Sequence, residues 1–182
     1  MIWYWLKVII YNLQPFKLII VRTLVLGLGN PILTDDGVGV LVAEAVRSHL
    51  PQDTSIDISE VSVGGLSLME AMVGYDRVIL VDAYQSENGK PGTIPKMSLA
   101  DLDAVNPTQH SVSPHDANLT TALRTGQQMG LHLPDEITIF AIEVENVTEF
   151  GDRLTPSVAA AIPAVTKLIL EEINPSQPQS TQ

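Results

Sequence analysis

The sequence contains no cysteine among its 182 residues. This absence excludes disulfide bonds, a thiolate nucleophile and a zinc site with cysteine ligands. Any metal ion bound by the chain would therefore be held by histidine, carboxylate or backbone oxygen. A chain without disulfides also suits a reducing compartment, and we expect a cytoplasmic protein.

Positive charge is scarce. Lys and Arg number 10 against 21 Asp and Glu, which gives a formal net charge of −11 at pH 7. Such a charge repels the phosphates of nucleic acids and of anionic membranes. We therefore expect neither a nucleic-acid partner nor a membrane partner, and the length suits a single domain.

Long hydrophobic runs are also missing. The most apolar stretch, MIWYWLKVIIYNLQPFKLII, is interrupted by Lys7, Pro15 and Lys17. It falls short of the roughly 18 to 20 apolar residues of a spanning helix, and it has no basic segment ahead of it as a secretory signal would. We expect residues 1–20 to be an N-terminal extension outside the core, with Val21 in the place of an initiator. The domain is then 21–173, and the polar residues 174–182 form a disordered tail.

From Thr23 onward, short apolar runs that suit buried strands alternate with segments of helical apolar spacing. This alternation predicts a three-layer α/β sandwich with a mostly parallel central sheet and helices on both faces, as in phosphorylase/hydrolase-like folds. Its ligands should lie outside the carboxyl ends of the strands. We expect strands over 23–28, 55–63, 77–83 and 137–144, a short edge strand within 88–98, and helices over 38–50, 66–72, 115–130 and 154–173, the last kinked at Pro163.

The stretch GLGNPILTDDGVG, residues 27–39, joins the first strand to the first helix. A dinucleotide-binding turn would place its third glycine where Ile32 stands, and Gly37 comes too late. The start GLGNP also resembles that of peptidyl-tRNA hydrolases, but no histidine follows it before His49, and the acidic surface does not suit tRNA. A peptidyl-tRNA hydrolase-like esterase is therefore the least favoured alternative.

Three segments in order, GLGNPILTDDGVGV, VILVDA and SPHDANL, carry a more specific resemblance. With GGLSLMEAMVGYDR and AIEVENV between and after them, the region 21–173 resembles the hydrogenase maturation proteases. These endopeptidases remove a C-terminal extension from the large-subunit precursor of [NiFe] hydrogenases. The resemblance implies that nickel already inserted in the precursor is recognised by Asp36, Asp82 and His115. Many members have Glu at the first of these positions, so the side chain here is shorter by one methylene.

The residue chemistry agrees with this set, because two carboxylates and one imidazole suit a divalent metal and leave coordination positions open. Each residue also has a purely structural interpretation: Asp36 and His115 could cap helices, and Asp82 could hold a loop. Asp35 is the rival of Asp36 and is expected to point into the turn. His110 is the rival of His115 but lies outside the matching stretch.

The catalytic mechanism stays open at this stage. We expect water to attack the peptide, with Asp36 or Asp82 as general base, and nickel either polarises the reacting groups or serves only as a recognition tag. Gly64 and Gly65 either leave room for a substrate segment or form an ordinary turn. A nickel-sensing or metallochaperone module without peptidase activity is the binding-only alternative. We expect a monomer without tightly bound metal, whose loops 85–96 and 144–154 select the hydrogenase.

Overall fold

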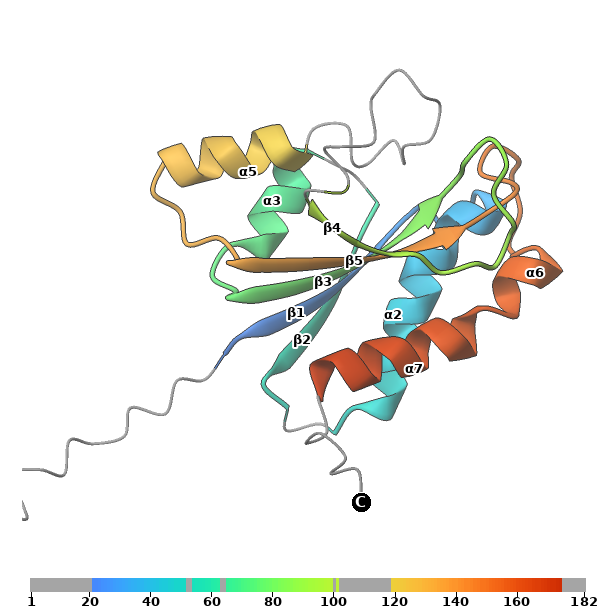
Figure 1. The fold of residues 1–182 in the computed structure, drawn as a ribbon, viewed down its shortest axis with the longest axis horizontal. Coiled ribbons are helices and arrows are strands. Elements are labelled where there is room, and N and C mark those ends of the chain that lie inside the picture. The colour runs from blue at the N-terminus through green and yellow to red at the C-terminus, as the bar shows by residue number, and fades with distance from the viewer. Residues whose placement is uncertain (1–20, 52–53, 63–64, 100, 102–118, 175–182) are drawn as a thin grey trace, which may run out of the picture.

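The computed structural model describes residues 21–51, 54–62, 65–99, 101 and 119–174. Its centre is a five-stranded sheet in the order β2-β1-β3-β5-β4 (Figure 1). Four strands are parallel and β4 pairs antiparallel with β5 at the edge. The strands are β1 (Thr23–Leu28), β2 (Ile56–Val61), β3 (Arg77–Tyr84), β4 (Lys96–Ser98) and β5 (Glu136–Glu143). The mostly parallel sheet and its short edge strand are as the sequence predicts.

Helices cover both faces of this sheet, which confirms the three-layer sandwich (Figure 1). The helices α2 (Val38–His49), α6 (Pro156–Ala159) and α7 (Ile162–Ile173) pack on one face, and α3 (Leu66–Met72) and α5 (Leu119–Gln128) pack on the other. Successive strand residues point to opposite faces, and each face therefore has its own core. In β1, for example, Val25 belongs to the α2–α7 core, whereas Leu24 and Leu26 belong to the α3–α5 core.

The C-terminal helix departs from the sequence prediction in one respect. The predicted single helix is divided into α6 and α7, with Pro163 at the second position of α7. Proline lacks an N–H and collides with the carbonyl four residues earlier, so it stands more easily in the first turn of a new helix than inside a long one. The expected kink is thus a complete break.

Two predicted boundaries concern residues that the structure does not describe. The proposed extension, residues 1–20, and the predicted tail, residues 174–182 apart from Asn174, lie outside the described ranges. Among the helices that are described, none combines the length and the apolar character needed to cross a membrane.

Candidate active site at the carboxyl edge of the sheet

The loop that follows β1 turns back over the carboxyl edge of the sheet. Gly29 has φ 133° and donates its N–H to the carbonyl of Val61, the last residue of β2, at 3.2 Å. A Cβ at Gly29 would lie 1.8 Å from the carbonyl oxygen of Asp36, so only glycine fits here. The loop then forms the 3₁₀ turn η1 (Thr34–Gly37), which packs against β3 and leads into α2.

Asp36 lies in η1 with only 5% of its surface exposed. Its Oδ2 accepts the backbone N–H of Asn30 at 2.7 Å, which ties the two ends of the loop together. The helix α2 has Gly37 at its N-cap position and no side-chain capping hydrogen bond. The helix-capping interpretation of Asp36 is therefore not observed, and its carboxylate is instead anchored within the loop after β1.

Asp82 lies near the carboxyl end of the central strand β3 and is 3% exposed. Its Oδ1 accepts the backbone N–H of Ala83 at 2.9 Å, which fixes the plane of the carboxylate. Val78 and Leu80 face the α3–α5 core, so the alternation of the strand places Asp82 on that same face.

Asp35 is fully buried and serves a different segment from its neighbour. Its carboxylate accepts the backbone N–H and the hydroxyl of Thr155, at 2.7 and 3.0 Å, and the N–H of Asn146 at 3.1 Å. A longer contact to the N–H of Glu145 measures 3.4 Å. The expectation that Asp35 points into its own turn is therefore wrong. Its carboxylate instead holds the loop after β5. Thr155 stands at the N-cap of α6, yet its hydroxyl bonds to Asp35 and not to the helix.

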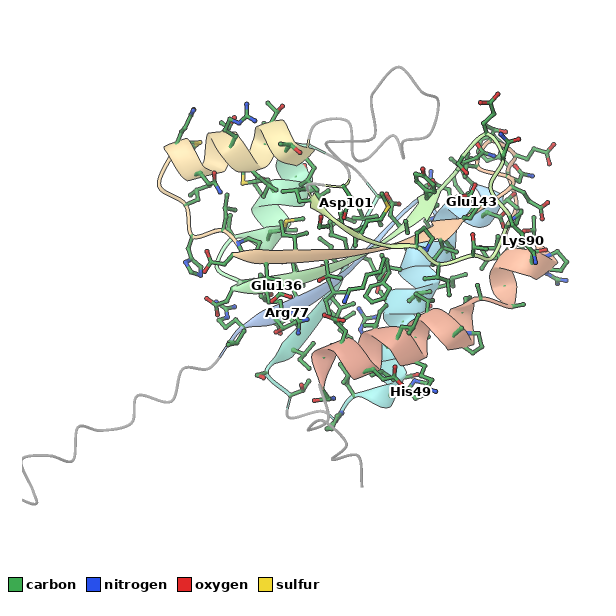
Figure 2. The ribbon with its side chains drawn as sticks, viewed as in Figure 1. His49, Arg77, Lys90, Asp101, Glu136 and Glu143 are labelled. Atoms are coloured by element: carbon green, nitrogen blue, oxygen red, sulfur yellow. The ribbon has the colours of Figure 1, made fainter. Side chains whose placement is uncertain are left out.

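Glu143, the last residue of β5, is a buried carboxylate that the sequence analysis did not identify (Figure 2). Its Oε1 accepts the N–H and the hydroxyl of Ser86 at 2.7 and 2.9 Å. Its backbone bonds to Thr93 and Gly92, and a Cβ at Gly89 would lie 1.7 Å from Oε1. Glu143 thus holds the loop after β3. An acidic residue that ends an apolar run, as in AIEV, is the signal that could have revealed it.

Among the described residues, four buried carboxylates therefore lie at the carboxyl edge: Asp35 and Glu143 hold loops that follow other strands, and Asp36 and Asp82 are the predicted site residues. His115 and His110 lie outside the described residues, as does Gly64. Within the described ranges, no group of three or more potential ligands is close enough to hold a metal ion. The complete ligand set stays a prediction. Gly65 has φ 65° and stands at the N-cap of α3, as a glycine in an ordinary strand-to-helix turn would. The role of Gly64 and Gly65 in substrate binding stays a prediction.

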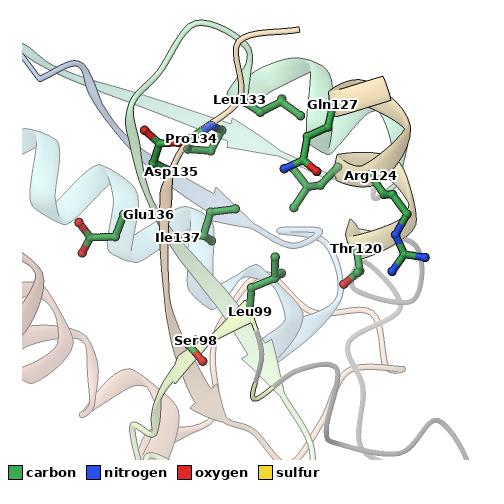
Figure 3. A pocket seen from close by; sticks show the side chains of 11 residues that line it. Ser98, Leu99, Thr120, Arg124, Gln127, Leu133, Pro134, Asp135, Glu136 and Ile137 are labelled. Atoms are coloured by element: carbon green, nitrogen blue, oxygen red, sulfur yellow. The ribbon is translucent and has the colours of Figure 1, made fainter. Parts of the chain in front are cut away.

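A cavity among the described residues lies elsewhere, between α5, β4 and the start of β5 (Figure 3). It measures about 540 Å³ and is lined by Leu99, Thr120, Arg124, Glu136 and Ile137 among others. Glu136 begins β5, whereas Glu143 ends it, so this cavity faces the amino end of that strand and not the predicted site.

Comparisons with known proteins agree with the resemblance seen in the sequence. The family model "Hydrogenase maturation protease" matches residues 40–172. The hydrogenase 2 maturation protease of Escherichia coli K12 is 30% identical over 155 residues, which cover 85% of this chain and 92% of the relative. The solved structure of the hydrogenase maturating endopeptidase HybD from E. coli superimposes with a TM-score of 0.71 at 30% identity, over 85% of this chain and 93% of that one. A hydrogenase expression/formation protein of Rhizobium leguminosarum is 30% identical, over 79% of this chain and 69% of the relative.

Proposed function

Since this chain belongs to the hydrogenase maturation protease family, a family of peptidases, we propose that it removes the C-terminal extension of a [NiFe] hydrogenase large-subunit precursor after nickel insertion. The observation that carries the proposal is the pair of buried carboxylates, Asp36 and Asp82, at the carboxyl edge of a sheet that matches this family. This edge is where an open α/β sheet binds its ligands.

The proposed chemistry is an aspartic-type hydrolysis. Asp36 or Asp82 takes a proton from water, the water oxygen bonds to the carbonyl carbon, and the peptide C–N bond breaks as the leaving nitrogen receives a proton. Both carboxylates have one oxygen fixed by a backbone N–H, which is the preorganisation that such a step needs. The chain has no cysteine that could serve as an alternative nucleophile.

We further propose that nickel arrives as part of the substrate and that Asp36, Asp82 and His115 complete its coordination. Supporting this, α5 runs antiparallel to β5, so its first residue, Leu119, lies toward the carboxyl edge (Figure 1). His115 precedes Leu119 by four positions in the sequence. Whether nickel polarises the carbonyl or acts only as a recognition tag is decided by the experiment below.

A site with two carboxylates, one imidazole and no thiolate should hold nickel weakly by itself, because sites rich in nitrogen and sulfur are what retain late transition metals. We propose that the free protein is a monomer, works in the cytoplasm and carries no tightly bound metal. The precursor would then be recognised only once nickel has been loaded, which makes cleavage a checkpoint of maturation.

The test offers the purified protein two forms of the precursor, one loaded with nickel and one metal-free, with a chelator removing stray ions. Mass spectrometry of the precursor should show loss of the C-terminal segment from the loaded form only. Equal cleavage of both forms would overturn the checkpoint. If instead nickel polarises the reacting groups, exchanging it for an inert ion of similar size should preserve binding and abolish cleavage. Binding of the loaded precursor with no cleavage under any condition would favour the nickel-sensing or metallochaperone alternative.

A further inference from the structure

Two large apolar side chains stand exposed beside the candidate site. Phe150 is 82% exposed and Ile32 is 58% exposed. They belong to different loops: Ile32 to the loop after β1, which carries Asp36, and Phe150 to the loop after β5, which Asp35 fastens.

These two loops are joined directly. An isolated parallel bridge pairs Leu33 with Gly151, formed by hydrogen bonds from Thr34 N to Gly151 O (3.3 Å) and from Gly151 N to Ile32 O (3.1 Å). The parallel register sets Ile32 alongside Phe150. Both side chains are exposed, although Ile32 itself lies in the turn that the bond from Leu33 N to Asn30 O closes at 3.0 Å.

The backbone beneath this pair is firmly anchored. The Thr34 hydroxyl donates to Glu149 O at 2.8 Å, and a Cβ at Gly151 would lie 2.7 Å from that hydroxyl oxygen. Asp35 adds its hydrogen bonds to Thr155 and Asn146 from the interior. The two side chains are thus held outward by a preformed backbone and are not exposed through fraying. Rigid exposed aromatic groups are effective contact residues, because little conformational entropy remains to be lost on binding.

We propose that Ile32 and Phe150, here called the docking pair, bind an apolar side chain of the hydrogenase large-subunit precursor and so hold its scissile segment against Asp36. This inference rests on the proposed function. The argument for the precursor as occupant is continuity: Ile32 and Asp36 lie four residues apart in one loop, which the bond from Asn30 N to Asp36 closes into a unit. The loop that carries Asp36 therefore also carries one member of the docking pair, and the bridge between Leu33 and Gly151 holds the other member next to that loop.

The charges around the docking pair define the chemistry of the partner further. The loop after β5 carries three exposed carboxylates and one exposed guanidinium, and its net charge is therefore negative. The carboxylates belong to Glu145, Glu149 and Asp152, and the guanidinium to Arg153. The precursor segment that packs on the docking pair should therefore carry Lys or Arg next to its apolar residue, and raised salt should weaken its binding.

The test measures KM and kcat for cleavage of the purified nickel-loaded precursor by Ile32→Ser, Phe150→Ser and the double variant. The matched control is Met129→Ser, which removes an apolar side chain that is 69% exposed just after α5, away from the carboxyl edge. Phe150→Ser should raise KM about tenfold, and the double variant more, with kcat nearly unchanged. Phe150→Trp should restore the wild-type KM, and Met129→Ser should match wild type.

The outcomes separate this inference from the proposed function. If wild-type protein cleaves the loaded precursor and the double variant, folded by circular dichroism, keeps a KM within twofold of wild type, the docking pair is not a substrate site. If the wild type fails to cleave, it is the proposed function that fails. Should sedimentation show a dimer that Phe150→Ser dissociates without a change in KM, the pair joins two copies of the chain and the inference is overturned.

Discussion

The two edges of the sheet use charge in opposite ways. At the amino edge, charged side chains meet partners of opposite sign. Arg22 lies 3.9 Å from Asp57 and both are largely exposed, whereas Arg77, 17% exposed, pairs at 3.4 Å with the exposed Glu136 (Figure 2). At the carboxyl edge, Asp35, Asp36, Asp82 and Glu143 are at most 5% exposed, and the hydrogen bonds described above come to them from backbone N–H and hydroxyl groups.

The difference agrees with the proposal that the carboxyl edge carries the chemistry. Exposed ion pairs contribute about 0 to 1 kcal/mol each and tolerate change. Buried carboxylates are costly unless they are well hydrogen-bonded, and a protein keeps them where they hold structure or act on a ligand. Asp35 and Glu143 hold loops that follow other strands, while Asp36 and Asp82 are the two carboxylates that we propose act on the substrate.

The largest effect on activity is expected from Asp36→Asn at the carboxyl edge. The amide oxygen of Asn can still accept the N–H of Asn30, so the melting temperature should stay within about 3 °C of wild type. Cleavage of the nickel-loaded precursor should fall at least ~100-fold, because the charge and the basicity are lost. The control is Asp135→Asn, an exposed aspartate at the amino edge, with unchanged activity.

His115→Ala should give the same loss of cleavage with a preserved fold, measured in the same assay. Full processing by either variant would remove that residue from the proposed site.

The next largest effect should be on stability, in Asp35→Ala. This change leaves the N–H and hydroxyl of Thr155 and the N–H of Asn146 without their acceptor, at a cost of about 2 to 4 kcal/mol in the free energy of unfolding. Urea denaturation measures it. Asp57→Ala, from an exposed ion pair at the amino edge, is the matched control and should change stability by less than about 1 kcal/mol. Equal effects of the two would abolish the distinction between the edges.

The sequence predicts the architecture well because the apolar periodicity is regular: the strand expected over 23–28 and the helix expected over 66–72 have those bounds in the structure. The candidate site is harder. Asp35 and Asp36 are identical neighbours, and their different roles arise from contacts with Thr155 and Asn146, more than a hundred residues away. No local pattern encodes such pairing. The sequence did not reveal the partner of Glu143 for the same reason, because the residue that donates to it, Ser86, follows another strand.

A smaller effect on the free energy of unfolding is expected at Glu143, where two substitutions separate the contribution of the charge from that of the hydrogen bonds. Glu143→Ala removes the acceptor for the N–H and hydroxyl of Ser86 and should cost about 2 kcal/mol in the free energy of unfolding. Glu143→Gln keeps an oxygen at that place and should lose less than half as much. Chemical denaturation of both variants tests this. An equal loss in the two variants would contradict this expectation and show that the negative charge itself holds the loop after β3.

The smallest effect is expected at the amino edge, in how the free energy of unfolding changes with pH under acidic conditions. The backbone N–H of Arg22 bonds to the carboxylate of Asp76 at 2.8 Å, and this bond, with a contact to His132, lowers the pKa of Asp76 below its usual value of 3.8. A lowered pKa in the folded state means that the contribution of Asp76 to stability is complete above the pKa of the unfolded chain and is lost as the pH falls through the lower folded value. Asp76→Asn should therefore flatten the fall in stability below about pH 4 and leave its slope at neutral pH unchanged. Urea midpoints measured from pH 2.5 to 7 test this, with Asp135→Asn as the exposed control. A changed slope between pH 5 and 7 would contradict the assignment.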